Sequence, residues 1–307
     1  MKNTFLFLFI CFSISAQNII IENIEFKTEA TKLSFPEGII YDYDETIYFS
    51  NCYSNWIGKL NKNGLDTLLI KPTTPVDFGK TNGLAIYSDK NLYACDYGIG
   101  AILKISNEGY CDTFITGYNG QKFNRPNDIT FTPDGNMYFT DPKSYDKNVL
   151  DGVIYFIDMK TKEIKPAFSG LGFPNGIAIG PCKKYLYVSE SAKNRVLRFK
   201  ILEDGTITDS TEIVHLPGGD PDGLAFDSMG NLYIAHFGGG KIVVVSPNKD
   251  IIKTIKTPGK KPSNLEFAGD NLKTIYITED ETNCVYSMQT EIAGLKLFSS
   301  PKKTNND

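Results

Sequence analysis

Residues 123–142, FNRPNDITFTPDGNMYFTDP, contain the pattern that decides the fold. Two short runs of alternating apolar and polar residues, ITFT and MYFT, are separated by TPDG, which is typical of a tight turn between antiparallel strands. Polar side chains stand at the outer ends of both runs, with Arg125, Asn127 and Asp128 before the first and Asp141 after the second. A hairpin alone does not require them.

The same two-strand pattern occurs six times along the chain. Counted from Gly38 and its counterparts, the copies begin at positions 38, 83, 128, 176, 223 and 264. Most copies carry two further short strands, and a period in the forties with four strands is typical of one β-propeller blade. We therefore predict an all-β fold, a six-bladed β-propeller with four antiparallel strands per blade.

The two ends of the chain lie outside this pattern. Residues 1–16 contain Lys2, a short apolar run and small residues, which predicts a secretory signal peptide cut after Ala16 or after Ser15. The protein is then exported, to the periplasm or the medium. We expect residues 17–300 to form one propeller domain and residues 301–307 a polar tail. Because the sixth copy lacks an outer strand, we expect the segment 19–26, IIIENIEF, to close the ring.

Composition excludes several classes of partner. The formal net charge is −4 and no basic cluster occurs, which argues against a nucleic-acid partner. Beyond residue 16 no apolar stretch is long enough to cross a membrane, and nothing indicates a protein partner. Five cysteines follow residue 16, and this odd number favours free thiols, with one or two disulfides left open.

Two columns of polar side chains run through the six copies. Because the second strand of a blade returns to the face where the first strand begins, both columns are expected at one end of the propeller. The inner column, nearest the axis, consists of Glu37, Asn82, Asn127, Asn175, Asp222 and Ser263. The second column consists of Asn51, Asp96, Asp141, Glu190, His236 and Glu279.

The inner column predicts one divalent cation. Asn-Gly and Asp-Gly pairs are also good turn formers, but that interpretation leaves Glu37 and Asn127 unexplained. Carboxylates that converge on an axis repel one another unless a positive charge lies between them. Carboxylate and amide oxygens favour a hard cation, so we expect Ca²⁺, with Mg²⁺, Mn²⁺ and Zn²⁺ left open.

At these residues the sequence resembles the gluconolactonase/regucalcin-like (senescence marker protein) family of six-bladed propeller hydrolases. The motifs that carry the resemblance are FPEG (35–38), NRPNDITFTPDGNMYFTDP (124–142), FPNGIAIG (173–180), DPDGLAFD (220–227) and HFGGGKI (236–242). They span nearly all of the chain that follows the predicted signal peptide.

The resemblance implies a role for each matching residue. The implied cation ligands are Glu37, Asn127, Asn175 and Asp222. Asp222 also matches the family's general base or nucleophile, and Arg125 matches a position that reaches the substrate. Asn127 matches a position that contacts the cation or the substrate near it. We add Asn82, another inner-column residue, to the expected substrate-binding side chains.

We therefore expect a metal-dependent lactonase that hydrolyses a sugar-type (gluconolactone-like) or other small lactone. Diisopropyl-fluorophosphatase-like and paraoxonase-like enzymes share the propeller and the cation arrangement, so a phosphotriester hydrolase is one alternative. A non-catalytic propeller that binds a ligand on its polar face is another. The loop 141–152 is longer than most of its counterparts, and we expect it to form part of a lid.

Overall fold

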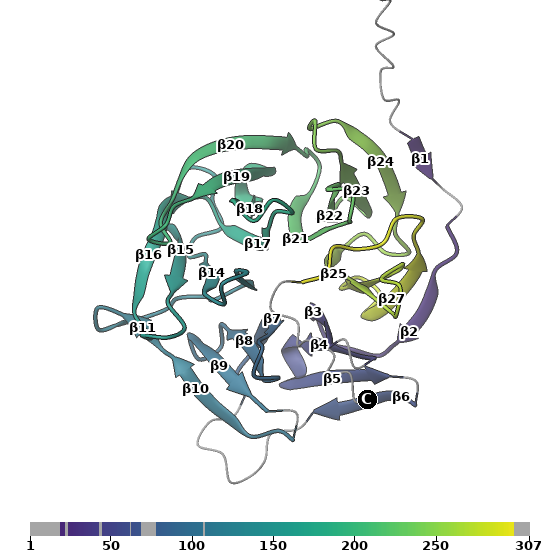
Figure 1. Cartoon of the computed structure of the whole chain (residues 1–307). Coiled ribbons are helices and arrows are strands. Elements are labelled where there is room, and N and C mark those ends of the chain that lie inside the picture. The colour runs from purple at the N-terminus through teal and green to yellow at the C-terminus, as the bar shows by residue number, and fades with distance from the viewer. Residues whose placement is uncertain are drawn as a thin grey trace, which may run out of the picture.

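The computed structural model describes residues 19–21, 24–42, 45–61, 63–68, 78–106 and 108–297. Six β-sheets surround a central axis like the blades of a propeller, as Figure 1 shows in a view along that axis. The predicted fold class is therefore confirmed. The predicted signal peptide and polar tail lie outside the described residues, so both stay predictions.

Blades one to three each hold four antiparallel strands, numbered outward from the axis. Blade one consists of β3 (Pro36–Asp42), β4 (Thr46–Asn51), β5 (Trp56–Asn61) and β6 (Gly64–Leu68). Blade two consists of β7 (Thr81–Ile86), β8 (Leu92–Asp96), β9 (Ala101–Ile105) and β10 (Cys111–Ile115). A small hairpin, β11 (Gly117–Tyr118) and β12 (Gln121–Lys122), leads to blade three, which consists of β13 (Ile129–Phe131), β14 (Met137–Asp141), β15 (Gly152–Ile157) and β16 (Ile164–Leu171).

Blades four to six repeat the arrangement. Blade four consists of β17 (Pro174–Ile179), β18 (Tyr185–Glu190), β19 (Arg195–Ile201) and β20 (Ile207–His215). Blade five consists of β21 (Asp220–Phe226), β22 (Leu232–Phe237), β23 (Lys241–Val245) and β24 (Ile251–Lys256). From the C-terminal part of the chain, blade six takes β25 (Pro262–Ala268), β26 (Thr274–Glu279) and β27 (Cys284–Gln289).

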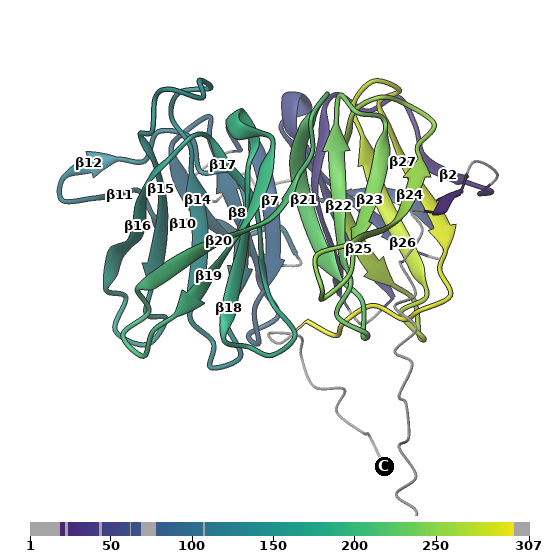
Figure 2. The ribbon, with the colours of Figure 1, turned by 90° about the horizontal axis from the view of Figure 1, so that it is seen from above.

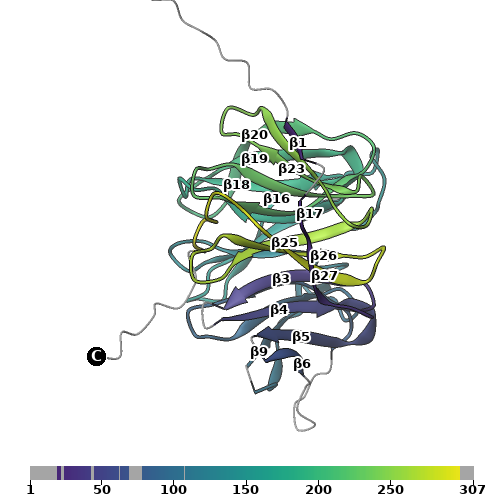
Figure 3. The ribbon, with the colours of Figure 1, turned by 90° about the vertical axis from the view of Figure 1, so that its right-hand side faces the viewer.

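The N-terminal segment closes the ring, but not with the stretch that the sequence indicated. The outer strand of blade six is β2 (Lys27–Ala30), which pairs antiparallel with β27. The strand β1 (Ile19–Ile21) pairs in parallel with β24, as a fifth strand of blade five. Figure 3 shows this purple segment running over the edge of the yellow blade six. Closure of the ring by an N-terminal strand is therefore confirmed, but the predicted residues 19–26 were wrong, because Lys27–Ala30 form that strand and β1 extends blade five.

Aromatic side chains pack neighbouring blades together. Tyr93 of blade two stands edge-on to Phe131 of blade three, with ring centroids 5.4 Å apart. In the same way, Tyr187 of blade four packs against Phe226 of blade five, and Tyr233 of blade five packs against Phe267 of blade six. Such T-shaped pairs add to the energy of apolar burial, so these repeated tyrosines belong to the core.

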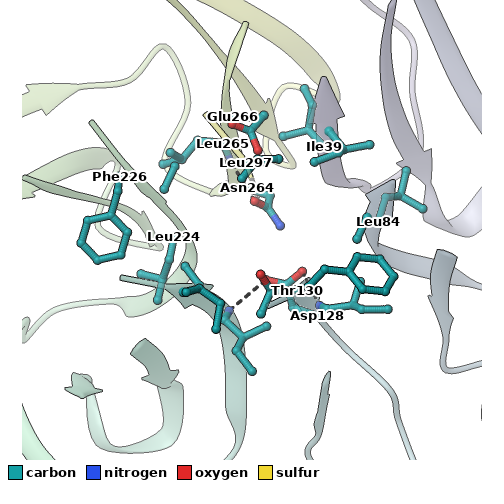
Figure 4. A pocket seen from close by; sticks show the side chains of 18 of the residues that line it. Ile39, Leu84, Asp128, Thr130, Leu224, Phe226, Asn264, Leu265, Glu266 and Leu297 are labelled. Carbon is teal, nitrogen blue, oxygen red and sulfur yellow. Dashed lines mark hydrogen bonds between the residues drawn. The ribbon is translucent and has the colours of Figure 1, made fainter. Parts of the chain in front are cut away.

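The two ends of the propeller differ. Figure 2 shows the 3-10 helices η1 (Cys52–Ser54) and η2 (Ser191–Lys193) at one end, and the yellow C-terminal segment crossing the other. The second end is closed by hydrogen bonds such as that from the Leu295 N–H to the Phe226 carbonyl. Between the ends lies an axial channel of about 80 Å³, into which Asp128 and Glu266 point from opposite sides (Figure 4).

Two further features concern the whole chain. No helix within the described ranges is long and apolar enough to span a membrane. The five cysteines among the described residues are all free, four of them buried and Cys182 exposed.

Candidate functional site

A cavity of about 400 Å³ opens at the end of the propeller that carries η1 and η2. It brings together every residue that the sequence predicted for the site. These are Glu37, Asn82, Arg125, Asn127, Asn175 and Asp222. Their placement in one cavity agrees with the column argument, while the role of each stays a prediction.

The inner column lies at the floor of this cavity because the first strands pack closely around the axis. A Cβ atom on Gly38 would lie 2.1 Å from the carbonyl oxygen of Asn82, and one on Gly176 would lie 2.1 Å from that of Asp222. Since real atoms do not approach so closely, only glycine lets neighbouring blades come together here.

Hydrogen bonds between blades fix the backbone of the inner column. The hydroxyl of Ser50 donates to the Asn82 carbonyl at 2.6 Å. The hydroxyls of Thr140 and Ser189 repeat this bond to the next blade, at 2.8 and 2.7 Å respectively. Each donor lies on a second strand, one residue before the second column. The site residues therefore start from a rigid ring of backbone.

The second column supports the loops that enter the first strands. Asp141 accepts hydrogen bonds from the N–H groups of Asn124 and Arg125, the latter at 2.6 Å. Asp96 accepts four backbone N–H groups, including that of Lys80 at 2.8 Å. This explains the polar ends of the opening stretch, since each such carboxylate holds the turn that carries a cavity residue.

Other members of the second column act in the same way. Asn51 accepts from the Ser34 N–H at 2.6 Å, and Glu190 from the Gly172 N–H at 2.8 Å. Glu279 accepts from the Lys261 N–H at 2.7 Å. His236 is buried, and its Nε2 lies 3.1 Å from the Leu216 carbonyl oxygen.

The two acidic residues of the inner column share an unfavourable electrostatic environment. Burial, reinforced by the charge of Asp128, raises the pKa of Glu37 to about 8. Burial and then the charge of Glu37 raise the pKa of Asp222 well above its ordinary value, and Asp280, Asp128 and Asp220 act in the same direction. Two buried carboxyls whose ionised forms are disfavoured by burial and by neighbouring carboxylates are a setting in which a cation is stabilising.

The donor set fits a hard divalent cation. Among the described residues, no three His, Cys, Asp or Glu side chains are close enough to hold a metal ion by themselves. A cation therefore needs the amide oxygens of Asn127 and Asn175 in addition to the carboxylates of Glu37 and Asp222. Mixed carboxylate and amide ligands suit Ca²⁺ or Mg²⁺ better than Zn²⁺, which prefers imidazole and thiolate.

Aromatic side chains form the wall above this floor, and sequence reasoning missed them. We call them the aromatic collar: Phe35, Tyr53, Tyr97, Tyr145, Phe173 and Phe237. Phe35 stacks on Tyr53 with ring centroids 4.6 Å apart. Phe35 and Phe173 both adopt left-handed backbone conformations, with φ of 58° and 56°. Such strain in non-glycine residues is typical of functional sites.

The expected lid loop contributes to the collar. Tyr145 belongs to the loop 141–152, and its ring centroid lies 5.1 Å from that of Phe173. Its hydroxyl donates to Asp220 at 2.6 Å. The loop therefore takes part in the cavity wall, and whether it opens and closes stays a prediction.

Two basic side chains complete the wall. The ammonium nitrogen of Lys80 lies 5.0 Å from the ring centroid of Tyr53, and the guanidinium of Arg125 lies 5.9 Å from that of Phe173. Both basic residues stand two positions before an inner-column residue, as do Phe35, Phe173 and Asp220. Reading this third column of the repeat would have revealed half of the residues of the wall.

Comparisons with known proteins agree with the fold and show the family. The model of the SMP-30/gluconolactonase/LRE-like region matches residues 35–280. The lactonase drp35 of Staphylococcus haemolyticus is 29% identical over 240 residues, which cover 73% of this chain and 70% of that protein. The diisopropyl-fluorophosphatase of Loligo vulgaris is 28% identical over 261 residues, which cover 79% of this chain and 82% of that protein.

A solved structure shows the same architecture. The regucalcin of Agrobacterium tumefaciens, described as a calcium-binding protein, superposes with a TM-score of 0.78 at 16% identity. The match covers 92% of this chain and 98% of that chain. At this identity the likeness supports the fold alone.

Proposed function

The chain belongs to the SMP-30/gluconolactonase/LRE-like family, and on that premise we propose that it is a divalent-cation-dependent hydrolase that opens small lactones. The observation that carries the proposal is the floor of the cavity, where Glu37 and Asp222 lie with the amide side chains of Asn127 and Asn175. Burial and then neighbouring carboxylates raise the pKa of both acidic residues. A binding scaffold gains nothing from buried carboxylates that repel one another.

The proposed chemistry assigns the cation ligands predicted above to the floor. When bound there, a divalent cation supplies a Lewis acid that polarises the lactone carbonyl. Asp222, whose pKa is raised by burial and then by neighbouring carboxylates, takes a proton from the attacking water or attacks directly. Arg125 from the wall and Asn82 from the floor orient the rest of the substrate.

The collar bears on the class of lactone. Six aromatic rings favour a substrate with a flat or apolar body over a polyhydroxylated sugar, which needs many hydrogen-bond partners. Lys80 and Arg125 are placed to meet an electron-rich or anionic group at the opposite end of such a substrate. Aryl and alkyl lactones are therefore the first substrates to test, and gluconolactone the comparison.

The test is hydrolysis of a lactone panel by protein that has been treated with a chelator and then supplied with Ca²⁺, Mg²⁺ or Mn²⁺. We expect activity to depend on the cation, and Asp222→Asn and Glu37→Gln to reduce kcat/KM by at least about a hundredfold. Glu212→Gln, on the exposed outer strand of blade four, is the matched control. Full activity in both site variants, or no activity of the parent protein with any cation, would support a binding module instead.

A phosphotriester substrate is the second candidate, and it is favoured by the similarity to the diisopropyl-fluorophosphatase of Loligo vulgaris. The same floor serves both reactions, because each needs a hard cation and a nearby carboxylate. Adding one phosphofluoridate to the panel separates the two, since the better substrate shows the larger kcat/KM.

A further inference from the structure

Asp280 is a buried carboxylate without a partner. It follows the last residue of β26 and is 8% exposed. Within the part of the chain that the structure describes, neither carboxylate oxygen has a hydrogen-bond partner. Its backbone N–H donates to the Lys261 carbonyl at 3.0 Å, a bond that any residue except proline would supply. A buried carboxylate in this state is unfavourable unless a compensating charge or donor arrives from outside.

The repeat places Asp280 beside the cavity. It directly follows the second column, and the residues at the same position in three other blades all line the cavity: Tyr97, Ser191 and Phe237. Burial, then Glu37, raise the pKa of Asp280 to about 10, and Asp280 in turn raises the pKa of Asp222. Asp280 is therefore electrostatically linked to both acidic residues of the floor.

We propose that Asp280 is a third carboxylate of the cation site, which acts from behind Glu37 and Asp222 to strengthen cation binding. This inference rests on the cation-dependent function proposed above. Because no three acidic side chains among the described residues can share one ion, Asp280 acts through its charge and through water rather than as a direct ligand. The inner-column residue of blade six cannot take this role, since the Ser263 hydroxyl donates to the Pro36 carbonyl at 2.8 Å.

The rival explanation is an ion pair with Lys261, whose charge lowers the pKa of Asp280. The Lys261 ammonium lies 5.7 Å from the ring centroid of Phe237. If the pair formed in solution, removal of the Asp280 charge would destabilise the cation-free protein. If Asp280 is instead unpaired until a cation binds, removal of its charge stabilises the cation-free protein.

The experiment measures calcium affinity and melting temperature side by side. Ca²⁺ is titrated calorimetrically into chelator-treated protein, and thermal melts are recorded with chelator present. The variants are Asp280→Asn and Asp280→Ser, the latter carrying the residue found at the equivalent position of blade four. Glu266→Gln is the matched control, because it removes a buried carboxylate of blade six that lines the axial channel instead of the cavity.

We expect both Asp280 variants to bind Ca²⁺ about tenfold more weakly or worse, and to melt higher than the parent in chelator. Glu266→Gln also melts higher, but it changes calcium affinity by less than about twofold. Unchanged affinity in Asp280→Asn, or a lower melting temperature in chelator, overturns the inference and leaves the proposed function intact. If the parent protein binds none of Ca²⁺, Mg²⁺ and Mn²⁺, the cation site itself fails, and the proposed function fails with it.

Discussion

Calcium binding to the cation-free protein is expected to release protons at neutral pH. Glu37, with its pKa raised to about 8, holds a proton at pH 7 in the folded, cation-free state. A divalent cation binds the ionised carboxylate and displaces that proton. The apparent affinity therefore falls about tenfold for each pH unit below 8, which amounts at pH 6 to about a hundredfold or roughly 2.7 kcal/mol.

The assay is calorimetric titration of Ca²⁺ at pH 7 in two buffers with different ionisation enthalpies. The slope of the observed enthalpy against the buffer enthalpy gives the number of protons released. Glu37 alone predicts about 0.9 of a proton, because a group with a pKa of about 8 is roughly nine-tenths protonated at pH 7. Any proton that Asp222 holds adds to this number.

The control is Glu37→Gln, which binds Ca²⁺ more weakly and releases about one proton fewer than the parent. A parent protein that binds Ca²⁺ with the same affinity at pH 6 and pH 8, and without proton release, would refute the reasoning. The carboxyl would then be ionised before the cation arrives, and the burial argument would be wrong.

Three further predictions concern the scaffold. Burial raises the pKa of Glu266 to about 8, so the folded state binds more protons than the unfolded state between pH 4.5 and 8, and stability falls as pH rises. Glu266→Gln should therefore raise the free energy of unfolding by on the order of 3 kcal/mol at pH 7 and by little at pH 4. Equal effects at both pH values would contradict this. Asp96→Asn should lower the free energy of unfolding by about 2 kcal/mol or more, in chelator and in Ca²⁺ alike, because a neutral amide replaces a carboxylate that accepts four N–H groups. A loss of stability seen only with Ca²⁺ would place Asp96 in the cation site. Gly176→Ala should lower the free energy of unfolding by about 2 kcal/mol or more, because its Cβ would meet the Asp222 carbonyl. Gly172→Ala, with no atom within 3.4 Å of the new Cβ, should lower it by less than about 1 kcal/mol. Similar urea midpoints for the two variants would argue against a rigid ring of backbone.

The sequence predicted the cavity floor because the six copies are related by near-rotational repetition. Once Glu37, Asn127 and Asp222 occupy equivalent positions at the start of a first strand, the propeller brings them to one point on the axis. The same logic failed for ring closure. Packing and register determine which few N-terminal residues pair with blade six. The sequence of Lys27–Ala30 carries no signal that separates this strand from Ile19–Ile21.

The roles of the polar columns could not be assigned from chemistry alone. Asp96 and Asp222 are both aspartates at the same end of the propeller, yet the first accepts four backbone N–H groups and the second is surrounded by carboxylates. The difference is one of hydrogen-bond partners, which depend on loop geometry. Asp280 was missed for a similar reason, since it lies one position after the second column and only its lack of hydrogen-bond partners distinguishes it.

Charge is distributed unevenly around the cavity. Carboxylates come from blades five, six and one, with Asp222, Asp280 and Glu37, whereas the basic side chains that line the cavity, Lys80 and Arg125, come from blades two and three. The residues of the collar come from blades one to five, so aromatic rings stand on both sides. Under the proposed function, a lactone would place the carbonyl that is attacked towards the acidic side, where the proposed cation would lie, and its electron-rich end towards the basic side. Because the six blades share one backbone plan, this polarity comes from side chains at three repeat positions, and substrate preference can change while the propeller stays the same.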